Sequence, residues 1–146
     1  MKLFEIAPRA RGLKAYGWGT REYHTPFPIE HIDEDLSLLY IGIKKRLLQA
    51  PVRPMKLDSL IAIQTSVFKP VVSMYKKTTD VVPISVARIN GKNYIIDGTH
   101  RATAAWAQRK DEINAHFLEY KDLDVNQYFA SRTTKEWNDI LDKAQV

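Results

Sequence analysis

The chain has 146 residues, of which 45% are hydrophobic and 27% are charged, a composition typical of a soluble globular domain that can bury a core. It contains no cysteine, which excludes disulfides, thiolate metal sites and a cysteine nucleophile. The formal net charge of +5 and the pI of about 9.4 are compatible with a polyanionic partner but do not establish one. No segment resembles a signal peptide or is long enough to span a membrane, so we expect a cytoplasmic protein with no membrane partner.

Residues 1–28 are predicted to form an irregular arm, because glycine and proline recur along them. Aromatic side chains such as Tyr16 and Trp18 alternate there with basic ones. An arm of this kind can lie on nucleic acid, with charges for the phosphates and rings for the bases. In the alternative, which we favour, the rings pack back onto the domain and the arm wraps around it.

Residues 32–49 are predicted to form a helix, because apolar side chains recur at steps of three and four between Leu36 and Leu47. Acidic residues in its first turn and basic residues in its last turn suit the helix dipole. Pro51 to Pro54 is expected to be a short linker. The basic residues near the end of the helix and in the linker are candidate contacts to nucleic acid: Lys44, Lys45, Arg46, Arg53 and Lys56.

The segment after the linker is predicted to begin with a strand or turn over residues 57–63. A helix is expected over residues 66–77, with Ser66 as a possible cap. Pro70 must lie in the first turn of this helix or break it.

A hairpin is predicted over residues 84–96, because β-branched and aromatic residues flank Asn90-Gly91. Both of these turn residues tolerate the positive φ that a two-residue loop requires. Along the second strand, Ile95 should face one side of the sheet and its two neighbours the other. An alanine-rich helix over residues 99–110 follows.

The C-terminal part is predicted to hold one more strand and a helix. Residues 113–118 alternate between apolar and polar side chains, which is typical of a strand. Residues 122–146 contain apolar side chains that can pack on one face of a helix, and Thr133 or Thr134, with Glu136 close behind, is a plausible helix start.

The residues Asp97-Gly98-Thr99-His100-Arg101 join the hairpin to the alanine-rich helix. The free N–H groups and the partial positive charge of a helix start favour a phosphate, and glycine lets a ligand approach the backbone. His100 adds a titratable donor and Arg101 a permanent bidentate donor, while Asp97 offers a carboxylate to a metal, a sugar hydroxyl or a proton. In the structural alternative, Asp97 and Gly98 make a tight connection, Thr99 is the N-cap and Arg101 lies in solvent.

This turn, followed by Ala104 and Ala105, resembles the phosphate-binding signature of the ParB/sulfiredoxin superfamily. Upstream, residues 57–64 resemble the opening strand and loop of that superfamily, and residues 81–86 resemble its entry into the hairpin. The resemblance covers about residues 57–118.

The resemblance implies an α/β (α+β) fold in which a mixed sheet is surrounded by helices. Residues 57–118 would form the core, and residues 1–56 and 119–146 would add N-terminal and C-terminal helical extensions to one compact unit. Members of the superfamily bind ATP, ADP or CTP at this turn. Some hydrolyse nucleotides, some cut DNA and some phosphorylate a small molecule, whereas the sulfiredoxins reduce an oxidised cysteine on a partner.

Differences between this chain and each group of the superfamily reduce the number of functions to be considered. The sulfiredoxins need a cysteine where this chain has Thr99, so sulfinic acid reduction is excluded. Partition proteins typically have Gly-Glu-Arg-Arg here and a following helix-turn-helix domain, for which residues 119–146 are too short. The kinase-like members share Asp-Gly-His-His-Arg, the most similar local pattern, but they place a catalytic glutamate near the position of Gln64, whose amide cannot act as a general base.

We therefore expect a nucleotide-binding phosphoester enzyme of the ParB-like nuclease group, an ATPase, a DNase or both. A small-molecule kinase and a non-catalytic module that binds nucleic acid or another partner are the alternatives. The expected ligands are ATP, ADP or CTP with Mg²⁺, and DNA is a further candidate partner. The candidate catalytic residues are Asp97, His100 and Gln64, the candidate phosphate-binding residues are Gly98, Thr99, His100 and Arg101, and the candidate Mg²⁺ ligand is Asp97.

Overall fold

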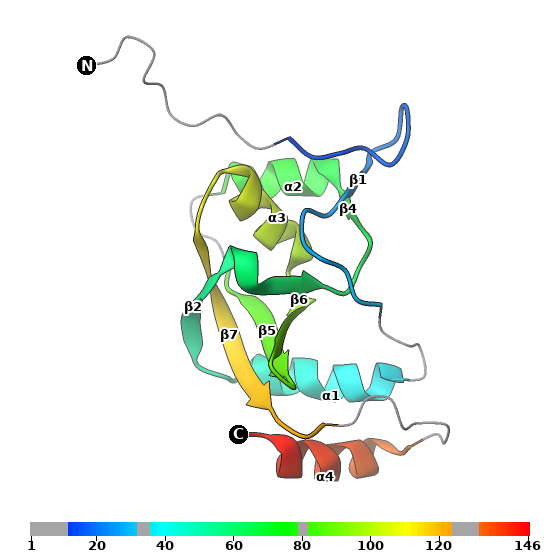
Figure 1. Ribbon diagram of the computed structural model, residues 1–146, viewed down its shortest axis with the longest axis vertical. Helices are drawn as coiled ribbons and strands as arrows, with labels where there is room; N and C mark the ends of the chain where they lie inside the picture. Colours follow the sequence, from blue (N-terminus) through cyan, green and yellow to red (C-terminus); the bar gives the residue numbers. More distant parts are fainter. Residues whose placement is uncertain (1–11, 32–35, 79–81, 124–131) are drawn as a thin grey trace, which may run out of the picture.

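A five-stranded mixed sheet with helices on both faces forms the centre of the protein (Figure 1). The computed structural model describes residues 12–31, 36–78, 82–123 and 132–146. The strands follow the order β2-β7-β5-β6-β3, in which β3–β6 and β5–β7 are parallel pairs. They are β2 (Val52–Lys56), β3 (Leu60–Ala62), β5 (Ile84–Ile89), β6 (Lys92–Asp97) and β7 (Glu112–Tyr120). The predicted α+β class with a mixed sheet is confirmed.

The hairpin at the middle of the sheet is the predicted one. Strands β5 and β6 pair antiparallel around Asn90 and Gly91, whose φ angles are 51° and 85°. Positive φ at both positions defines a loop whose twist matches that of the strands. Tyr94 and Ile96 pack with one hydrophobic cluster and Ile95 with the other, so the predicted alternation is confirmed as well.

Strand β2 replaces the predicted linker, and that prediction is wrong. Its register pairs Arg53 with Ala115 and Met55 with Ile113 of β7. Pro51 precedes the strand, and Pro54 is tolerated within it because β2 is an edge strand, where a missing N–H does not interrupt a second ladder. Met55 is buried and anchors this strand in the core.

The helices lie in two pairs at opposite ends of the molecule (Figure 1). They are α1 (Ser37–Leu47), α2 (Lys69–Lys76), α3 (Thr99–Ala107) and α4 (Thr134–Ala144), with the short 3-10 helix η2 (Leu57–Ser59) before β3. The prediction for residues 32–49 overlaps α1, although 32–35 lie outside the described residues. The helix predicted over 99–110 ends at Ala107, and Arg109 has a φ of 58° that stops it.

Two helix starts show how local chemistry sets the boundaries. Helix α4 begins at Thr134 with Thr133 as its N-cap, in agreement with the predicted start at Thr133 or Thr134. In its capping box, Thr133 and Glu136 bind each other's main-chain N–H groups. Helix α2 begins later than predicted, and Pro70 occupies its first turn. Ser66 does not cap it, because Ser66 opens strand β4 (Ser66–Phe68) instead.

The two faces of the sheet carry separate hydrophobic layers. On one face, Val86 and Ile95 pack against Ala102 and Ala105 of α3. On the other face, Ala87 packs beneath α1 and α4. The buried side chains that these two helices contribute are Leu39, Ile43, Leu47, Trp137 and Leu141.

The described part of the N-terminal arm packs partly onto the domain. Strand β1 (Glu22–His24) pairs with β4 in a second, two-stranded sheet. The ring of Tyr16 stacks on His24 with the centroids 3.7 Å apart, and its hydroxyl donates to the carbonyl of Thr65. Trp18, in contrast, is fully exposed. Packing of the rings is therefore confirmed for Tyr16 but not for Trp18, and residues 1–11 lie outside the described residues.

None of the helices in the described segments has the length and apolar character needed to cross a membrane.

Candidate functional site

The predicted site lies where two parallel strands end and helix α3 begins. The last paired residues of β3 and β6 are Ala62 and Ile95. The loop that contains Gln64 therefore leaves the sheet at the same end as Asp97, the last residue of β6. Ligands of open α/β sheets commonly bind beyond the carboxyl ends of parallel strands, so the position suits a binding site.

Gly98 makes the sharp connection between β6 and α3. It is the N-cap of α3 and has a φ of 105°, a conformation that L-residues rarely adopt. A Cβ at this position would lie 2.5 Å from Cγ2 of Ile84 and 3.1 Å from NH2 of Arg101. Packing and backbone conformation thus both require glycine here, whether or not a ligand binds.

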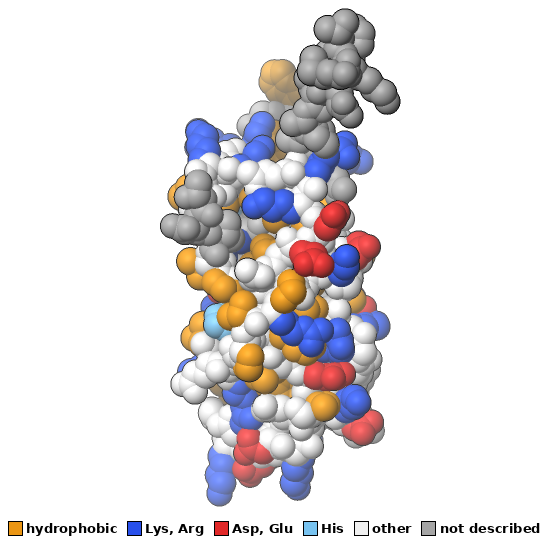
Figure 2. Space-filling model, turned by 90° about the vertical axis from the view of Figure 1, so that its left-hand side faces the viewer, with side chains coloured by type: hydrophobic (Ala, Val, Ile, Leu, Met, Phe, Trp, Pro, Cys, Tyr) orange, Lys and Arg blue, Asp and Glu red, His pale blue; other side chains and the backbone are white. Residues whose placement is uncertain are grey.

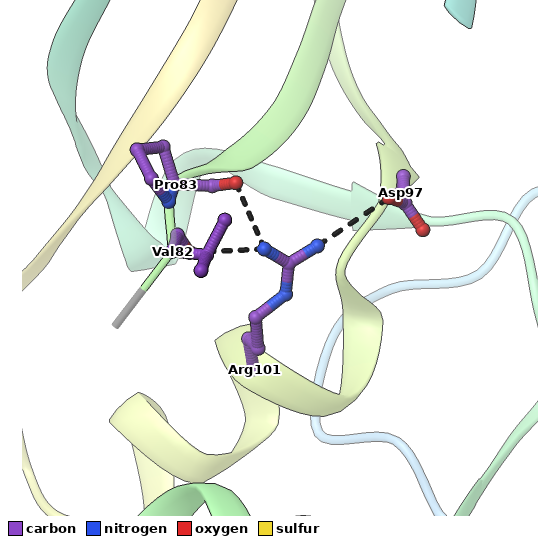
Figure 3. Close-up of polar contacts among 4 residues, drawn as sticks. All are labelled: Val82, Pro83, Asp97 and Arg101. Carbon is purple, nitrogen blue, oxygen red and sulfur yellow. Dashed lines mark hydrogen bonds and ion pairs between the residues drawn. The ribbon is translucent and has the colours of Figure 1, made fainter. Parts of the chain in front are cut away.

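The side chain of Arg101 points into the protein and not into solvent, and its guanidinium group makes three polar contacts there (Figure 3). NH1 donates to the carbonyls of Val82 and Pro83, at 2.9 Å each. NH2 lies 3.4 Å from Oδ2 of Asp97. Only 12% of the side chain is exposed. Arg101 therefore ties α3 to the segment that enters β5, and a phosphate would have to compete with two carbonyls for it.

His100 is linked to the strand β4 region. Its Nε2 accepts a hydrogen bond of 3.0 Å from the main-chain N–H of Phe68. An acceptor nitrogen carries no proton, so this geometry places the proton of the neutral ring on Nδ1. Burial lowers the pKa of His100 below its ordinary value, which also favours the neutral ring.

Thr99 and Gln64 are positioned by local structure. Thr99 is buried and makes no capping hydrogen bond, so the expectation that it is the N-cap is wrong: Gly98 takes that position. The side-chain amide of Gln64 donates to the carbonyl of Ser66 at 2.9 Å. The loop after β3 is therefore held in a turn of its own beside the start of α3.

The Asp97 side chain is half-exposed, and its carboxylate contacts the guanidinium group of Arg101. Within the described segments, no group of three or more His, Asp or Glu side chains is arranged to hold a metal ion. A Mg²⁺ ion that arrives with a nucleotide needs only one or two protein carboxylates, because phosphate oxygens and water fill its other positions. Asp97 therefore fits the role of a single Mg²⁺ ligand, but not that of a member of a protein-only metal site.

The basic residues predicted to contact nucleic acid are divided among different elements. Lys44 and Lys45 lie exposed in the last turn of α1. The others have contacts of their own: Arg46 with Asp142 at 2.8 Å, Lys56 with Glu112 at 3.5 Å, and Arg53 over the ring of Phe117 at 4.0 Å. The contact between Arg53 and Phe117 was not predicted, because it depends on the pairing of β2 with β7.

A groove of about 460 Å³, which no pattern in the sequence predicted, lies beside α3. Its lining includes the apolar side chains of Ala104, Ala105 and Ile113. Arg101, Gln108 and Lys110 add polar groups to the lining. The small alanine side chains leave this space open. Among the predicted site residues, Arg101 is the one that lines this groove.

Comparison of the chain with protein-family models and with curated proteins finds no match. The resemblance to the ParB/sulfiredoxin superfamily therefore stays a prediction from the sequence, based on the residues of the turn and on the elements predicted around it.

Proposed function

We propose that this protein is a nucleotide-binding phosphoester enzyme of the ParB-like nuclease group, an ATPase or DNase that holds phosphate at the start of α3. The observation that carries the proposal is the junction at Gly98. There, α3 begins immediately after β6 and beside the loop that follows the parallel strand β3. This junction brings Asp97, His100 and Gln64 to one end of the sheet.

The phosphate would be bound chiefly by the main chain. The first-turn N–H groups of a helix have no intrahelical partner, and the helix dipole adds a partial positive charge. The guanidinium group of Arg101 adds a full charge close to this turn, although its N–H groups serve Val82 and Pro83. Arg101 thus supports the proposal through charge and through the position of α3.

The side chains divide the remaining roles. The Nδ1–H of neutral His100 is a hydrogen-bond donor that suits a phosphate oxygen, since Nε2 is already an acceptor. The Asp97 carboxylate would hold Mg²⁺, which supplies charge neutralisation for the phosphate oxygens. Phosphoryl transfer depends mainly on positioning and electrostatic stabilisation, and groups of these kinds provide both.

A non-catalytic binding module on the same fold is the second candidate. The contacts of Arg101, His100 and Gln64 with the protein's own main chain favour it, because side chains held in this way stabilise the turn without a ligand. Asp97 separates the two candidates, since an enzyme needs its carboxylate and a binding module does not.

The test is incubation with radiolabelled Mg²⁺-ATP, with and without plasmid DNA and with candidate small-molecule acceptors. The proposal predicts free phosphate or nicked DNA from the parent protein and little of either from Asp97→Asn. Asp58→Asn is the matched control, because Asp58 is an exposed carboxylate at η2. A labelled small molecule would indicate a kinase. Nucleotide binding without any product would indicate the binding module, and loss of activity in both variants alike would remove Asp97 from the site.

A further inference from the structure

Two arginines lie over one phenylalanine ring on three neighbouring strands. Cζ of Arg53, on β2, is 4.0 Å from the ring centroid of Phe117, on β7. Cζ of Arg88, on β5, is 5.0 Å from the same centroid. The order β2-β7-β5 places the ring between the two arginine-bearing strands. We call these three residues the Arg–Phe–Arg surface.

The surface occupies the part of the sheet face that extends beyond α3. Arg88 points to the same side as Val86, two residues earlier on β5, and Val86 packs with the layer under α3. Arg53 is exposed, and Phe117 and Arg88 are half-buried. Since Ile84 contacts Gly98, Arg88 lies four residues, or about 13 Å, along β5 from the α3 turn.

The charges of both arginines are open to a partner. Among the described residues, neither guanidinium group has a carboxylate within 4.0 Å. Glu119 is the register partner of Arg88 on β7, but it forms no such ion pair. Nε of Arg88 donates to Oδ1 of Asn93 at 2.7 Å, which fixes the side chain and leaves its terminal nitrogens as donors.

We propose that the Arg–Phe–Arg surface binds single-stranded nucleic acid. Contact with an aromatic ring restricts an arginine side chain while its N–H groups stay available to phosphates. The flat guanidinium groups that the ring holds in place also stack with bases, whose faces a single strand exposes and a duplex hides. An acidic peptide would satisfy the charges but has no bases to stack on these flat groups. The proposal is independent of nucleotide binding at Gly98.

The charge of the molecule agrees with this partner. The formal net charge is +5. Figure 2 shows one face on which Lys and Arg side chains are spread from one end of the molecule to the other, with hydrophobic side chains and a smaller number of Asp and Glu side chains between them. A chain of phosphates is attracted by such a distribution, and the attraction weakens as salt rises.

The experiment is fluorescence anisotropy with a labelled single-stranded oligonucleotide of about 16 nucleotides at about 50 to 200 mM salt. The double variant Arg53→Ala/Arg88→Ala is expected to lose about tenfold or more in affinity and to reduce the salt slope by about two. Lys135→Ala/Lys143→Ala removes the same charge from exposed positions of α4, on the other face of the sheet, and is expected to change affinity less than about twofold. Phe117→Leu keeps both charges and the apolar packing, and it is expected to weaken binding severalfold.

Arg53→Lys/Arg88→Lys keeps the charges, and we expect it to restore only part of the affinity because the flat groups are lost. Thermal unfolding of each variant confirms that it is folded. An equal loss of affinity in the α4 control would overturn the proposal. So would equal affinity for a duplex of the same sequence, equal competition by polyglutamate, or no binding at low salt.

Discussion

The main-chain N–H of Phe68 donates a hydrogen bond of 3.0 Å to Nε2 of His100. It joins the residue before α2 to the first turn of α3, and these two helices pack against each other. The bond needs an unprotonated Nε2, so protonation of His100 would break it. The start of α3 is therefore coupled to pH through this ring.

Stability should fall as the pH falls below about 6.5, the pKa of histidine in an unfolded chain. Burial lowers the pKa of His100 in the folded state, so the unfolded state binds the proton more readily. The contribution of His100 is thus complete above about pH 6.5 and is lost as the pH falls through the folded-state pKa. Urea unfolding at a series of pH values measures it. His100→Gln, whose amide oxygen accepts a hydrogen bond without titrating, should flatten the profile, whereas His31→Gln, at an exposed position, should not. Identical profiles for both variants would contradict the coupling.

Arg101→Ala should lower the free energy of unfolding by about 1.5–3 kcal/mol, the range for hydrogen bonds from a charged group. The reason is the loss of two bonds to the carbonyls of Val82 and Pro83 and of the contact with Asp97. Arg101→Lys should recover part of the stability, because a single ammonium group cannot reproduce the fork. Arg21→Ala, at an exposed arginine, is the control for chemical denaturation. Unchanged stability together with nucleotide binding weakened by roughly tenfold to a hundredfold would make Arg101 a phosphate ligand instead.

Gly98→Ala should destabilise the protein more than Gly91→Ala. Both glycines have a positive φ, and an L-residue in that region costs about 1–2 kcal/mol. A Cβ at Gly91 would meet nothing within 4 Å, whereas a Cβ at Gly98 would clash with Ile84. The difference between the two free energies of unfolding measures the packing of the turn against β5. Equal values would show that Ile84 moves aside freely.

Thr133→Ala should cost about 1 kcal/mol of stability, typical of the loss of an N-cap. Thr133 accepts a hydrogen bond from the N–H of Glu136, and the Glu136 carboxylate accepts one from the N–H of Thr133. Thr133→Ser keeps the hydroxyl and should retain most of the stability. Thermal unfolding of both variants gives the comparison, and equal melting temperatures for alanine and serine would contradict a role for the cap.

Local signals in the sequence predicted the elements that depend on local chemistry. The turn at Asn90-Gly91 and the cap at Thr133 each depend on residues within three positions of one another. Strand β2 was missed because Pro54 is unfavourable in a strand unless the strand lies at an edge, and only the complete sheet shows where the edge is.

The contacts of the candidate site depend on residues that are distant in the sequence. The helix predicted over residues 99–110 begins at Thr99 in the structure as well, although Gly98 and not Thr99 is its N-cap. The partners of Arg101 are carbonyls 18 and 19 residues upstream, and a backbone carbonyl has no signature in a sequence. The Arg–Phe–Arg surface likewise needs the order of three strands, which follows from the crossover between β5 and β7.

The most direct test of the nucleotide-binding proposal is a titration of Mg²⁺-ATP, Mg²⁺-ADP and Mg²⁺-CTP into ¹⁵N-labelled protein, followed by NMR of the main-chain amides. Binding of phosphate at the start of α3 predicts saturable shifts centred on the amides of residues 98–101, with smaller shifts in the loop of residues 64–66. Inorganic phosphate should move the same signals at higher concentration. Shifts confined to the groove beside Ala104 and Ile113, or no shifts at millimolar nucleotide, would contradict a phosphate site at Gly98 and the function proposed from it.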